Sequence, residues 1–396
     1  MADAPQTRSS GLLPAGLSDL MPLEAAREAS VITAIMESFA GLGYARVKPP
    51  LVEFEDTLLA DGPGSALAQD TFRVMDPQSS RMMAIRADMT AQIARIASTR
   101  MAHQARPLRM AYSGDVLRVR PDPLNPERQL TQVGAELIGA SSVLHDAELA
   151  VAALVALQRA GAADLTIDLG VPRLLTAMVE DDAVLSDDLL QAVASKDHML
   201  VQKHGGGLAD ILCQLLDLPM VSSDKITAEV RGIMTKLPAK AAAMLEDLLE
   251  MARMVTHATD GINVTIDPLE SRGFDYHHGI GFAIFSTGIR GELGRGGRYR
   301  TIMDEDSGED STGVTLYLER VLRAVPAGDA QAVVYIPHDA SADDAGFSTW
   351  IAQSAAGHQC RFGQAGLADD QARIEDAKQM GATHIFTNGA VTPLNI

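Results

Sequence analysis

The segment from Leu117 to Glu136, LRVRPDPLNPERQLTQVGAE, constrains the fold more than any other part of this chain. Apolar residues alternate with more polar ones before it, and the alternation resumes after prolines at positions 121, 123 and 126. A period of two residues on both sides of a proline-rich interruption predicts two antiparallel strands joined by a loop. On the second strand, Gln132 and Glu136 would share one face of an otherwise apolar segment.

Polar side chains inside an apolar strand need partners, because burying a polar group without hydrogen bonds is costly. A bound ligand is one such partner, and the combination of Arg118, Gln132 and Glu136 suggests a site for a charged amino acid. The alternative is a sheet face that is simply exposed and polar, which is common in antiparallel sheets. Taken alone, the segment leaves both interpretations open.

The composition limits the classes of partner. With 396 residues, 46% of them hydrophobic, the chain can bury a core and form two or three folded units. Its 33 basic and 52 acidic residues give a net charge of −19. Because a polyanion is bound by clustered positive charge, this balance argues against tRNA binding. Only Cys213 and Cys360 are present, which favours a reducing compartment and no disulfide framework.

The first residues of the sequence do not have the pattern expected of a targeting signal. Residues 1–12 lack an apolar signal core and an Arg-rich presequence, so they are predicted to be a disordered lead. The longest apolar run, Ala150 to Leu157, is far shorter than the ~20 residues that span a bilayer. We therefore expect a cytoplasmic protein with no membrane partner.

Hydrophobic periodicity divides the chain into a core of residues 13–325 and a small C-terminal α/β domain of residues 331–396. Within the core, residues from about 171 to 260 have an almost wholly helical pattern, which predicts a helical insertion. The glycine-rich segment GELGRGGRY, residues 291–299, is interpreted as a tight turn between strands. The other predicted elements are helices at 22–42, 90–101 and 141–159, and strands at 44–52, 164–170, 262–266, 279–286 and 312–317.

The strand pair resembles motif 2 of the class II aminoacyl-tRNA synthetases, and its RQLTQVGAELIG is most similar to the histidyl branch. Further segments resemble that family in the same order along the chain: LPAGLSDLMP (13–22), GYARVKPPLVEFEDTL (43–58, motif 1), IRADMTAQIAR (85–95), SRGFDYHHGIGFAIF (271–285) and GVTLYLERVLR (313–323, motif 3). The resemblance covers most of the first 325 residues. It implies an α+β fold, with an antiparallel sheet flanked by helices.

The resemblance also implies a histidine-binding site. Asp88 and Thr90 match the positions that hold the amino group, and Arg118 matches the arginine of motif 2. Histidine-contacting positions are matched by Gln132, Glu136, Arg272, Tyr276 and His277, where His277 replaces a tyrosine of the family pattern. Arg320 matches the motif 3 arginine near ATP. A single arginine is more often a surface or ion-pair residue, but in register with these motifs the arginines are predicted to line a pocket.

No catalytic residue, cofactor or metal site is predicted. His277 and His278 are adjacent, but no HExxH pattern or cysteine cluster accompanies them. The family's motif 2 carries a glutamate that contacts adenine, whereas this chain has Val119 and Arg120 after Arg118. Arg300 replaces an acidic residue, and the loop DPLNPE lacks basic residues. Losing groups that position ATP should cost orders of magnitude in the rate of adenylation.

With these departures and its short C-terminal domain, the chain resembles the regulatory subunits of ATP phosphoribosyltransferase, a family of histidyl-tRNA synthetase-like paralogues. That resemblance implies a non-catalytic subunit of this glycosyltransferase, needed for the first step of histidine biosynthesis. Its partners would be the short-form catalytic subunit and L-histidine as feedback effector. A homodimer formed through motif 1 would assemble into a hetero-oligomer. The alternatives are an active histidine-tRNA ligase and a stand-alone histidine sensor.

Overall fold

The computed structural model describes residues 12–60, 64–121, 125–179, 185–218, 224–271, 273, 277–302, 308–326, 332–338, 343–364, 366–367 and 369–394. Residues 1–11 of the predicted lead lie outside this set. Contacts within the chain divide it into two compact units, Met1–Pro326 and Ala327–Ile396. Each unit is described by itself below.

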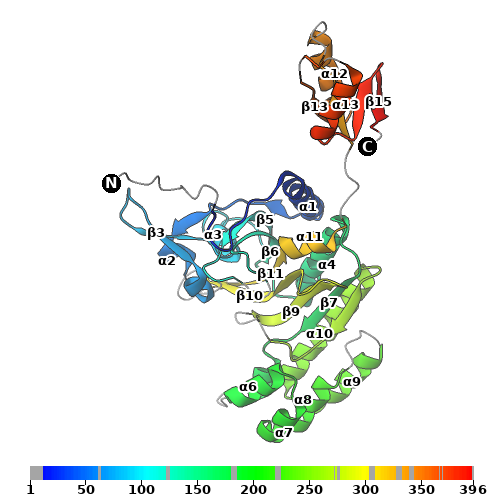
Figure 1. Ribbon diagram of the computed structural model, residues 1–396. Helices are drawn as coiled ribbons and strands as arrows, with labels where there is room; N and C mark the ends of the chain where they lie inside the picture. The colour runs from blue at the N-terminus through cyan, green and yellow to red at the C-terminus, as the bar shows by residue number, and fades with distance from the viewer. Residues whose placement is uncertain are drawn as a thin grey trace, which may run out of the picture. The chain divides into compact units, whose positions relative to one another are not determined.

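The first unit is built on an eight-stranded sheet with the strand order β1-β5-β6-β11-β10-β9-β7-β8 (Figure 1). Its strands are β1 (Ala45–Arg46), β5 (Leu108–Leu117), β6 (Gln129–Ile138), β7 (Leu165–Gly170), β8 (Asn263–Ile266), β9 (His277–Ser286), β10 (Gly294–Ile302) and β11 (Gly308–Tyr317). The six strands from β5 to β7 are antiparallel, and β1 and β8 run parallel to their neighbours. The predicted α+β fold with an antiparallel sheet is confirmed.

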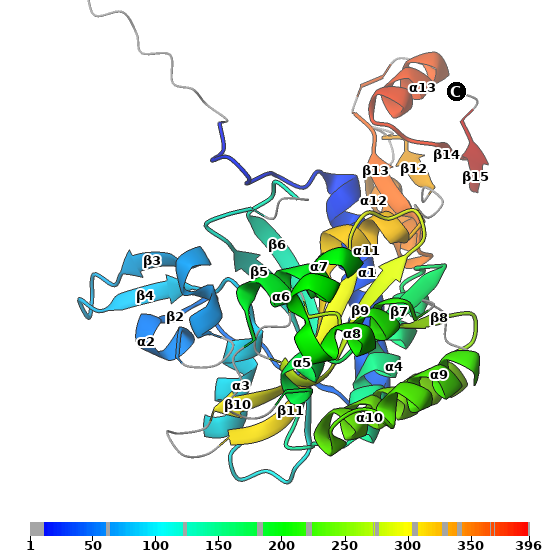
Figure 2. The same cartoon turned by 90° about the horizontal axis from the view of Figure 1, so that it is seen from below.

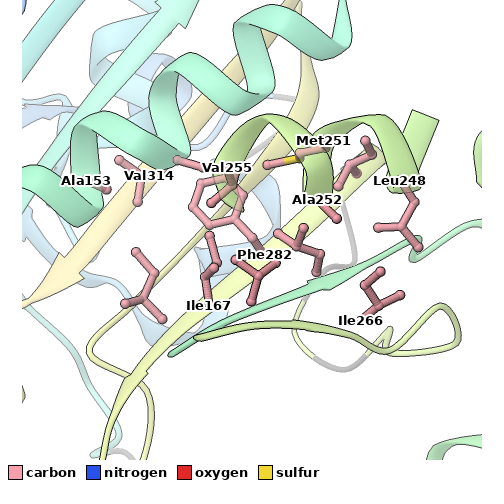
Figure 3. Packing of buried hydrophobic residues seen from close by; sticks show 14 of the residues in the cluster. Ala153, Ile167, Leu248, Met251, Ala252, Val255, Ile266, Phe282 and Val314 are labelled. Carbon is pink, nitrogen blue, oxygen red and sulfur yellow. The ribbon is translucent and has the colours of Figure 1, made fainter. Parts of the chain in front are cut away.

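One face of the sheet packs against helices and forms the hydrophobic core of this unit with them. It is covered by α1 (Pro22–Gly41), α4 (Val143–Arg159) and α10 (Ala239–Ala258), and α11 (Leu318–Ala324) follows β11 (Figure 2). Figure 3 shows Phe282 and Ile167 of the sheet packed against Val255 and Met251 of α10. Alternation along each strand sends the apolar residues to this face and leaves the intervening residues on the opposite face.

The opposite face is only partly covered. Helix α3 (Thr90–Thr99) packs there through a smaller apolar cluster that includes Met89, Ile93, Met110 and Tyr112. A separate three-stranded sheet, in the order β2-β4-β3, precedes α3. It consists of β2 (Val52–Phe54), β3 (Phe72–Met75) and β4 (Met82–Ile85), with α2 (Glu55–Leu58) and the 3₁₀ helix η1 (Ser65–Asp70).

The strand predicted over residues 44–52 is wrong in its extent. The chain forms the two-residue β1 and then an irregular stretch before β2. Pro49 and Pro50 lie in that stretch, and proline has no N–H with which to continue a ladder. Their carbonyl oxygens accept hydrogen bonds from the buried Arg86 and from Gln92 instead.

A group of helices lies between β7 and β8. It comprises α5 (Leu174–Ala177), α6 (Asp187–Ala194), α7 (His198–His204), the 3₁₀ helix η2 (Gly206–Leu208), α8 (Ala209–Leu216), α9 (Asp224–Met234) and α10. Ser186 and Asp197 cap α6 and α7, since their side chains accept from the amides of Leu189 and Leu200. Within the described residues, no helix is both long enough and apolar enough to cross a membrane.

The C-terminal unit is a small α/β structure with the strand order β13-β12-β14-β15. Its elements are β12 (Val333–Ile336), α12 (Asp343–Ala355), β13 (Gln359–Phe362), α13 (Asp370–Gln379), β14 (His384–Thr387) and β15 (Ala390–Pro393). The strands β13, β12 and β14 are parallel, and β15 is antiparallel to β14. Its core contains Tyr335, whose hydroxyl donates to the Asp376 carboxylate over 2.6 Å.

The interpretation of residues 291–299 as a tight turn is wrong, because Gly294 onward forms the central strand β10. Glycine is required at positions 296 and 297 because atoms of the neighbouring strands fill the space that a side chain would occupy. A Cβ atom at Gly296 would overlap with the Phe282 ring and the Gly313 carbonyl oxygen, and one at Gly297 would lie 2.7 Å from the His277 ring. Glycine here permits close packing of neighbouring strands rather than a change of chain direction.

We predict that Phe282→Ala lowers the free energy of unfolding by about 3 to 5 kcal/mol, because it leaves a cavity under α10. Urea denaturation followed by circular dichroism measures this loss. Met199→Ala is the control, since Met199 is 83% exposed and its truncation should change stability by no more than about 0.5 kcal/mol. Equal effects of the two substitutions would contradict this description of the core.

Candidate functional site

A cavity of about 150 Å³ opens on the sheet face opposite the main core. Cross-strand register explains its position: Glu136 of β6 pairs with Gly313 of β11, and Thr315 of β11 pairs with Arg295 of β10. Directly paired residues share a face, so these side chains converge. The lining residues are Asp88, Thr90, Glu136, Gly273, His277, Arg295, Gly296, Tyr299, Gly313, Val314, Thr315 and Tyr317.

Glu136 is the most buried acidic group in this cavity, with 1% of its surface exposed. Its carboxyl accepts from the hydroxyls of Tyr299 (2.9 Å), Tyr112 (3.2 Å) and Thr90 (3.2 Å). Burial is the main cause that raises the pKa of Glu136 to about 8; the nearby Asp88 carboxylate adds to the rise, and the hydrogen bonds from the three hydroxyls oppose it. The site therefore holds a carboxyl group that gains or loses a proton near neutral pH.

Gln132 fixes the second acid of the site. Its amide oxygen accepts from the Met89 backbone N–H (2.9 Å), so its amide nitrogen must point the other way. That nitrogen donates to Asp88 Oδ2 (2.6 Å) and to Thr315 Oγ1 (3.0 Å). The other oxygen of Asp88 accepts from the Thr90 backbone N–H (2.7 Å). Asp88 is thus held at the cavity wall in one orientation.

Arg86 anchors the segment that carries Asp88 and Thr90 to neighbouring elements. This arginine is 6% exposed, and it donates to the backbone oxygens of Asp115 (2.7 Å) and Pro49 (3.1 Å). Burial lowers the pKa of Arg86. A buried guanidinium that binds backbone carbonyls from separate elements rigidly ties these elements to one another. The irregular stretch after β1 is therefore coupled to the cavity wall.

Of the predicted histidine-binding residues, the structure brings four into the cavity lining: Asp88, Thr90, Glu136 and His277. Gln132 lies behind Asp88 and positions it. Arg118 does not line the cavity; its side chain is near the Ala87 carbonyl (3.4 Å). Arg272 and Tyr276 lie outside the described residues.

His277, which stands where the resembling family has a tyrosine, is 3% exposed. Its ring meets the ring of Tyr299 edge to face, with centroids 6.4 Å apart. His278 is more exposed and lies 3.4 Å from the carboxylate of Asp310. Among the residues that the structure describes, no group of three or more His, Cys, Asp or Glu is placed to hold a metal ion.

Two arginines that depart from the synthetase pattern, Arg120 and Arg300, and the motif 3 match Arg320 have partners within the protein. Arg120, at the position of the adenine-contacting glutamate, pairs with Asp70 (2.7 Å) on the surface. Arg300 lies 3.5 Å from Asp310. Arg320 is 7% exposed, stacks over the Tyr317 ring and donates to the Glu292 backbone oxygen (3.2 Å). These arginines have local structural partners in this chain.

Sequence reasoning missed the other residues of the site, among them Arg295, Tyr299 and Thr315 of the cavity lining and Tyr112, which donates to Glu136. Tyr112 occupies an apolar position in the alternating stretch before Leu117, and that pattern does not reveal its hydroxyl as a partner of Glu136. Arg295 and Tyr299 lie in the segment interpreted as a turn. A strand interpretation of that segment would have put Arg295, Gly297 and Tyr299 in alternation and revealed a polar face.

The comparisons with known proteins agree with the geometry. A sequence profile described as histidyl-tRNA synthetase matches residues 16–321. A protein of Rhodospirillum centenum named ATP phosphoribosyltransferase regulatory subunit is 45% identical over 342 residues, which cover 85% of this chain and 86% of that protein. This chain belongs to the ATP phosphoribosyltransferase regulatory subunit family.

A Gluconobacter oxydans protein with the same name is 37% identical and spans 98% of this chain and 99% of its own length. A crystal structure from Bacillus halodurans, described as an ATP phosphoribosyltransferase regulatory subunit/histidyl-tRNA synthetase, superposes with a TM-score of 0.77 at 22% identity. It covers 95% of this chain and 98% of that chain. The class II synthetase-like fold is therefore confirmed. The relatives' names fit a non-catalytic role and do not favour an active ligase.

We predict that the Glu136 carboxyl makes stability depend on pH. The folded state holds its proton up to about pH 8, whereas an unfolded chain releases it near 4.5. Between these values the folded state binds more protons, so the contribution of Glu136 to stability falls as the pH rises. From pH 5 to pH 8 the wild type should therefore lose more stability than Glu136→Gln, by on the order of a few kcal/mol. Urea denaturation at both pH values tests this, and parallel pH profiles would refute it.

Gly313→Ala should disturb the same carboxyl group. A Cβ atom there would lie 2.8 Å from Glu136 Cδ, and the backbone around it is held in the centre of the sheet. We expect a destabilisation of about 1 to 3 kcal/mol by thermal or urea denaturation. Gly232→Ala is the control, since that exposed helical glycine has open space around it and alanine should stabilise α9 by roughly 0.5 to 1 kcal/mol. The same sign for both substitutions would be inconsistent with this geometry.

Proposed function

We propose that the cavity binds L-histidine and that the chain is the histidine-responsive regulatory subunit of an ATP phosphoribosyltransferase complex. The observation that carries the proposal is the pairing of Glu136 and Asp88 in one small cavity. Two fixed acids suit a ligand with an ammonium group and a second nitrogen-bearing group. Asp88 accepts from the ammonium, and Glu136 meets the imidazole ring, whose nitrogens both donate and accept hydrogen bonds.

The pKa of Glu136 suits a contact with the imidazole ring of histidine. A carboxyl group with a pKa of about 8 donates to a neutral imidazole nitrogen when protonated and binds an imidazolium ion when ionised. The three hydroxyl groups around it can accompany either state because a hydroxyl both donates and accepts. Other amino acids lack this combination of ring size and titratable nitrogen, so the cavity favours histidine.

The proposed partner is the short-form catalytic subunit of the enzyme, which carries out the first step of histidine biosynthesis. Feedback inhibition then follows from linkage: histidine must bind one conformation of the complex more tightly than another, and the difference in affinity is the free energy of coupling. The Arg86 contacts offer a route, since they join the cavity wall to Pro49 and Pro50. We place a homodimer interface at residues 43–58, where Leu51 exposes 47% of its surface.

Glu136→Ala should weaken histidine binding by about 1.5 to 3 kcal/mol, the range for losing a hydrogen bond to a charged group. Isothermal titration calorimetry of the full chain measures this effect. Glu250→Ala is the control, because Glu250 lies on α10 and forms an exposed pair with Arg253 away from the cavity lining. In the complex with the catalytic subunit, the Glu136 variant should need correspondingly more histidine for half-inhibition.

Two results would contradict the proposal. One is an unchanged histidine affinity in Glu136→Ala, which would put the ligand elsewhere. The other is exchange of pyrophosphate into ATP in the presence of histidine at the rate of a synthetase, which would make the chain an active ligase. A chain that purifies from its native cell without a catalytic subunit would instead support a stand-alone sensor.

A further inference from the structure

We propose that Arg295 anchors the carboxylate of the amino-acid ligand, a role that neither the motifs nor the comparisons assign to it. The inference rests on the proposed function, since it names the group that holds the ligand's third charge. Two acids account for the ammonium and the ring, but a free amino acid also carries a carboxylate. Among the residues that line the described part of the cavity, Arg295 is the guanidinium.

The register of the sheet puts Arg295 at the correct end of the cavity. Thr315 is its direct partner on β11, and the same threonine accepts from the Gln132 amide that holds Asp88. Arg295 and Asp88 therefore flank one position, Thr315. The ammonium and carboxylate of an amino acid are attached to the same carbon atom, so their two anchors must lie side by side.

The other end of the cavity lies one strand repeat away. Glu136 pairs with Gly313, two residues along β11 from Thr315, and two residues of a strand span about 7 Å. That offset matches the reach of a histidine from its α-carbon substituents to its imidazole ring. Tyr299 and His277, which pair with each other across β9 and β10, line the same end. Charged residues line the end of the cavity proposed for the ammonium and carboxylate of the ligand, and the rings of Tyr299 and His277 line the end proposed for its imidazole.

Local packing fixes the guanidinium in place. Its Nε and Nη2 atoms both meet one carboxylate oxygen of Glu292, at 3.0 Å and 2.8 Å. Its Cζ atom would lie 2.8 Å from a Cβ atom at Gly273, which has a φ of +73° and also lines the cavity. Glycine at this position leaves room for Arg295. The guanidinium has five N–H donors in a planar fork, which matches the geometry of a carboxylate.

The Glu292 pair alone does not explain this placement. The chain has a second arginine three residues after a glutamate, Arg253 after Glu250, and that pair is exposed on α10 with side-chain exposures of 65% and 41%. The Arg295 and Glu292 side chains are exposed by 22% and 15%. Partial burial of a charged pair costs desolvation, which a surface pair avoids. Placing the pair at a cavity is the arrangement expected of a ligand-binding group.

The test compares two ligands on matched variants of the full chain. Histidinol keeps the ammonium and the imidazole of histidine but has a hydroxymethyl group in place of the carboxylate. Titration calorimetry with L-histidine and with histidinol would be carried out on wild type, Arg295→Met, Arg295→Lys and the control Arg253→Met. Circular dichroism establishes that each variant is folded.

We expect Arg295→Met to weaken histidine binding by about tenfold to a hundredfold and to change histidinol binding by less than about threefold. Arg295→Lys keeps the charge and should lose less than the methionine variant. Arg253→Met should leave both affinities unchanged. Equal weakening of the two ligands by Arg295→Met would make Arg295 a structural residue and overturn the inference, as would an unchanged histidine affinity. A wild type that binds neither ligand would overturn the proposed function itself.

Discussion

The rest of this site depends on the burial of the Glu136 carboxyl in the centre of the sheet. A buried acid is costly unless it is neutralised or hydrogen-bonded, and among the described residues its partners are three hydroxyl groups rather than a cation. The structure satisfies the group mainly by raising its pKa. An apolar residue at position 136 would avoid the cost of burying this carboxyl group. Buried acids with shifted pKa values are concentrated at functional sites, which supports the proposal that a ligand in the adjoining cavity uses this group.

One face of the large sheet forms the hydrophobic core, and the opposite face carries the cavity. Phe282 and Val314 pack in the main core (Figure 3), and the neighbours of Val314 on β11, Gly313 and Thr315, line the cavity. Glycine makes both possible. Gly296 and Gly297 allow β9, β10 and β11 to approach closely, and Gly313 leaves the volume that the Glu136 carboxyl occupies. The cost is a strand with three glycines, at 294, 296 and 297, which weaken its own packing and which the flanking strands stabilise on both sides.

The sequence predicted the fold through the parts that follow simple periodicity. The helices at α1, α4 and α10 and the pair β5–β6 were visible because their apolar residues repeat with the period of the element. Glu136 and Gln132 were identified as site residues because they interrupt such a pattern. β10 was missed because glycine carries no hydrophobic signal, and with it Arg295 and Tyr299. The small β2-β4-β3 sheet was missed because its strands are short and largely exposed, so that only pairing reveals them.

The central claim is that histidine binds in this cavity and not elsewhere in the chain or between subunits. Its most direct test is a crystal structure of the protein grown with L-histidine and ATP. The account predicts density for one histidine whose ammonium lies at Asp88 and whose ring lies at Glu136, with no adenylate formed. A histidine found only at another place, or an adenylate in this cavity, would contradict it.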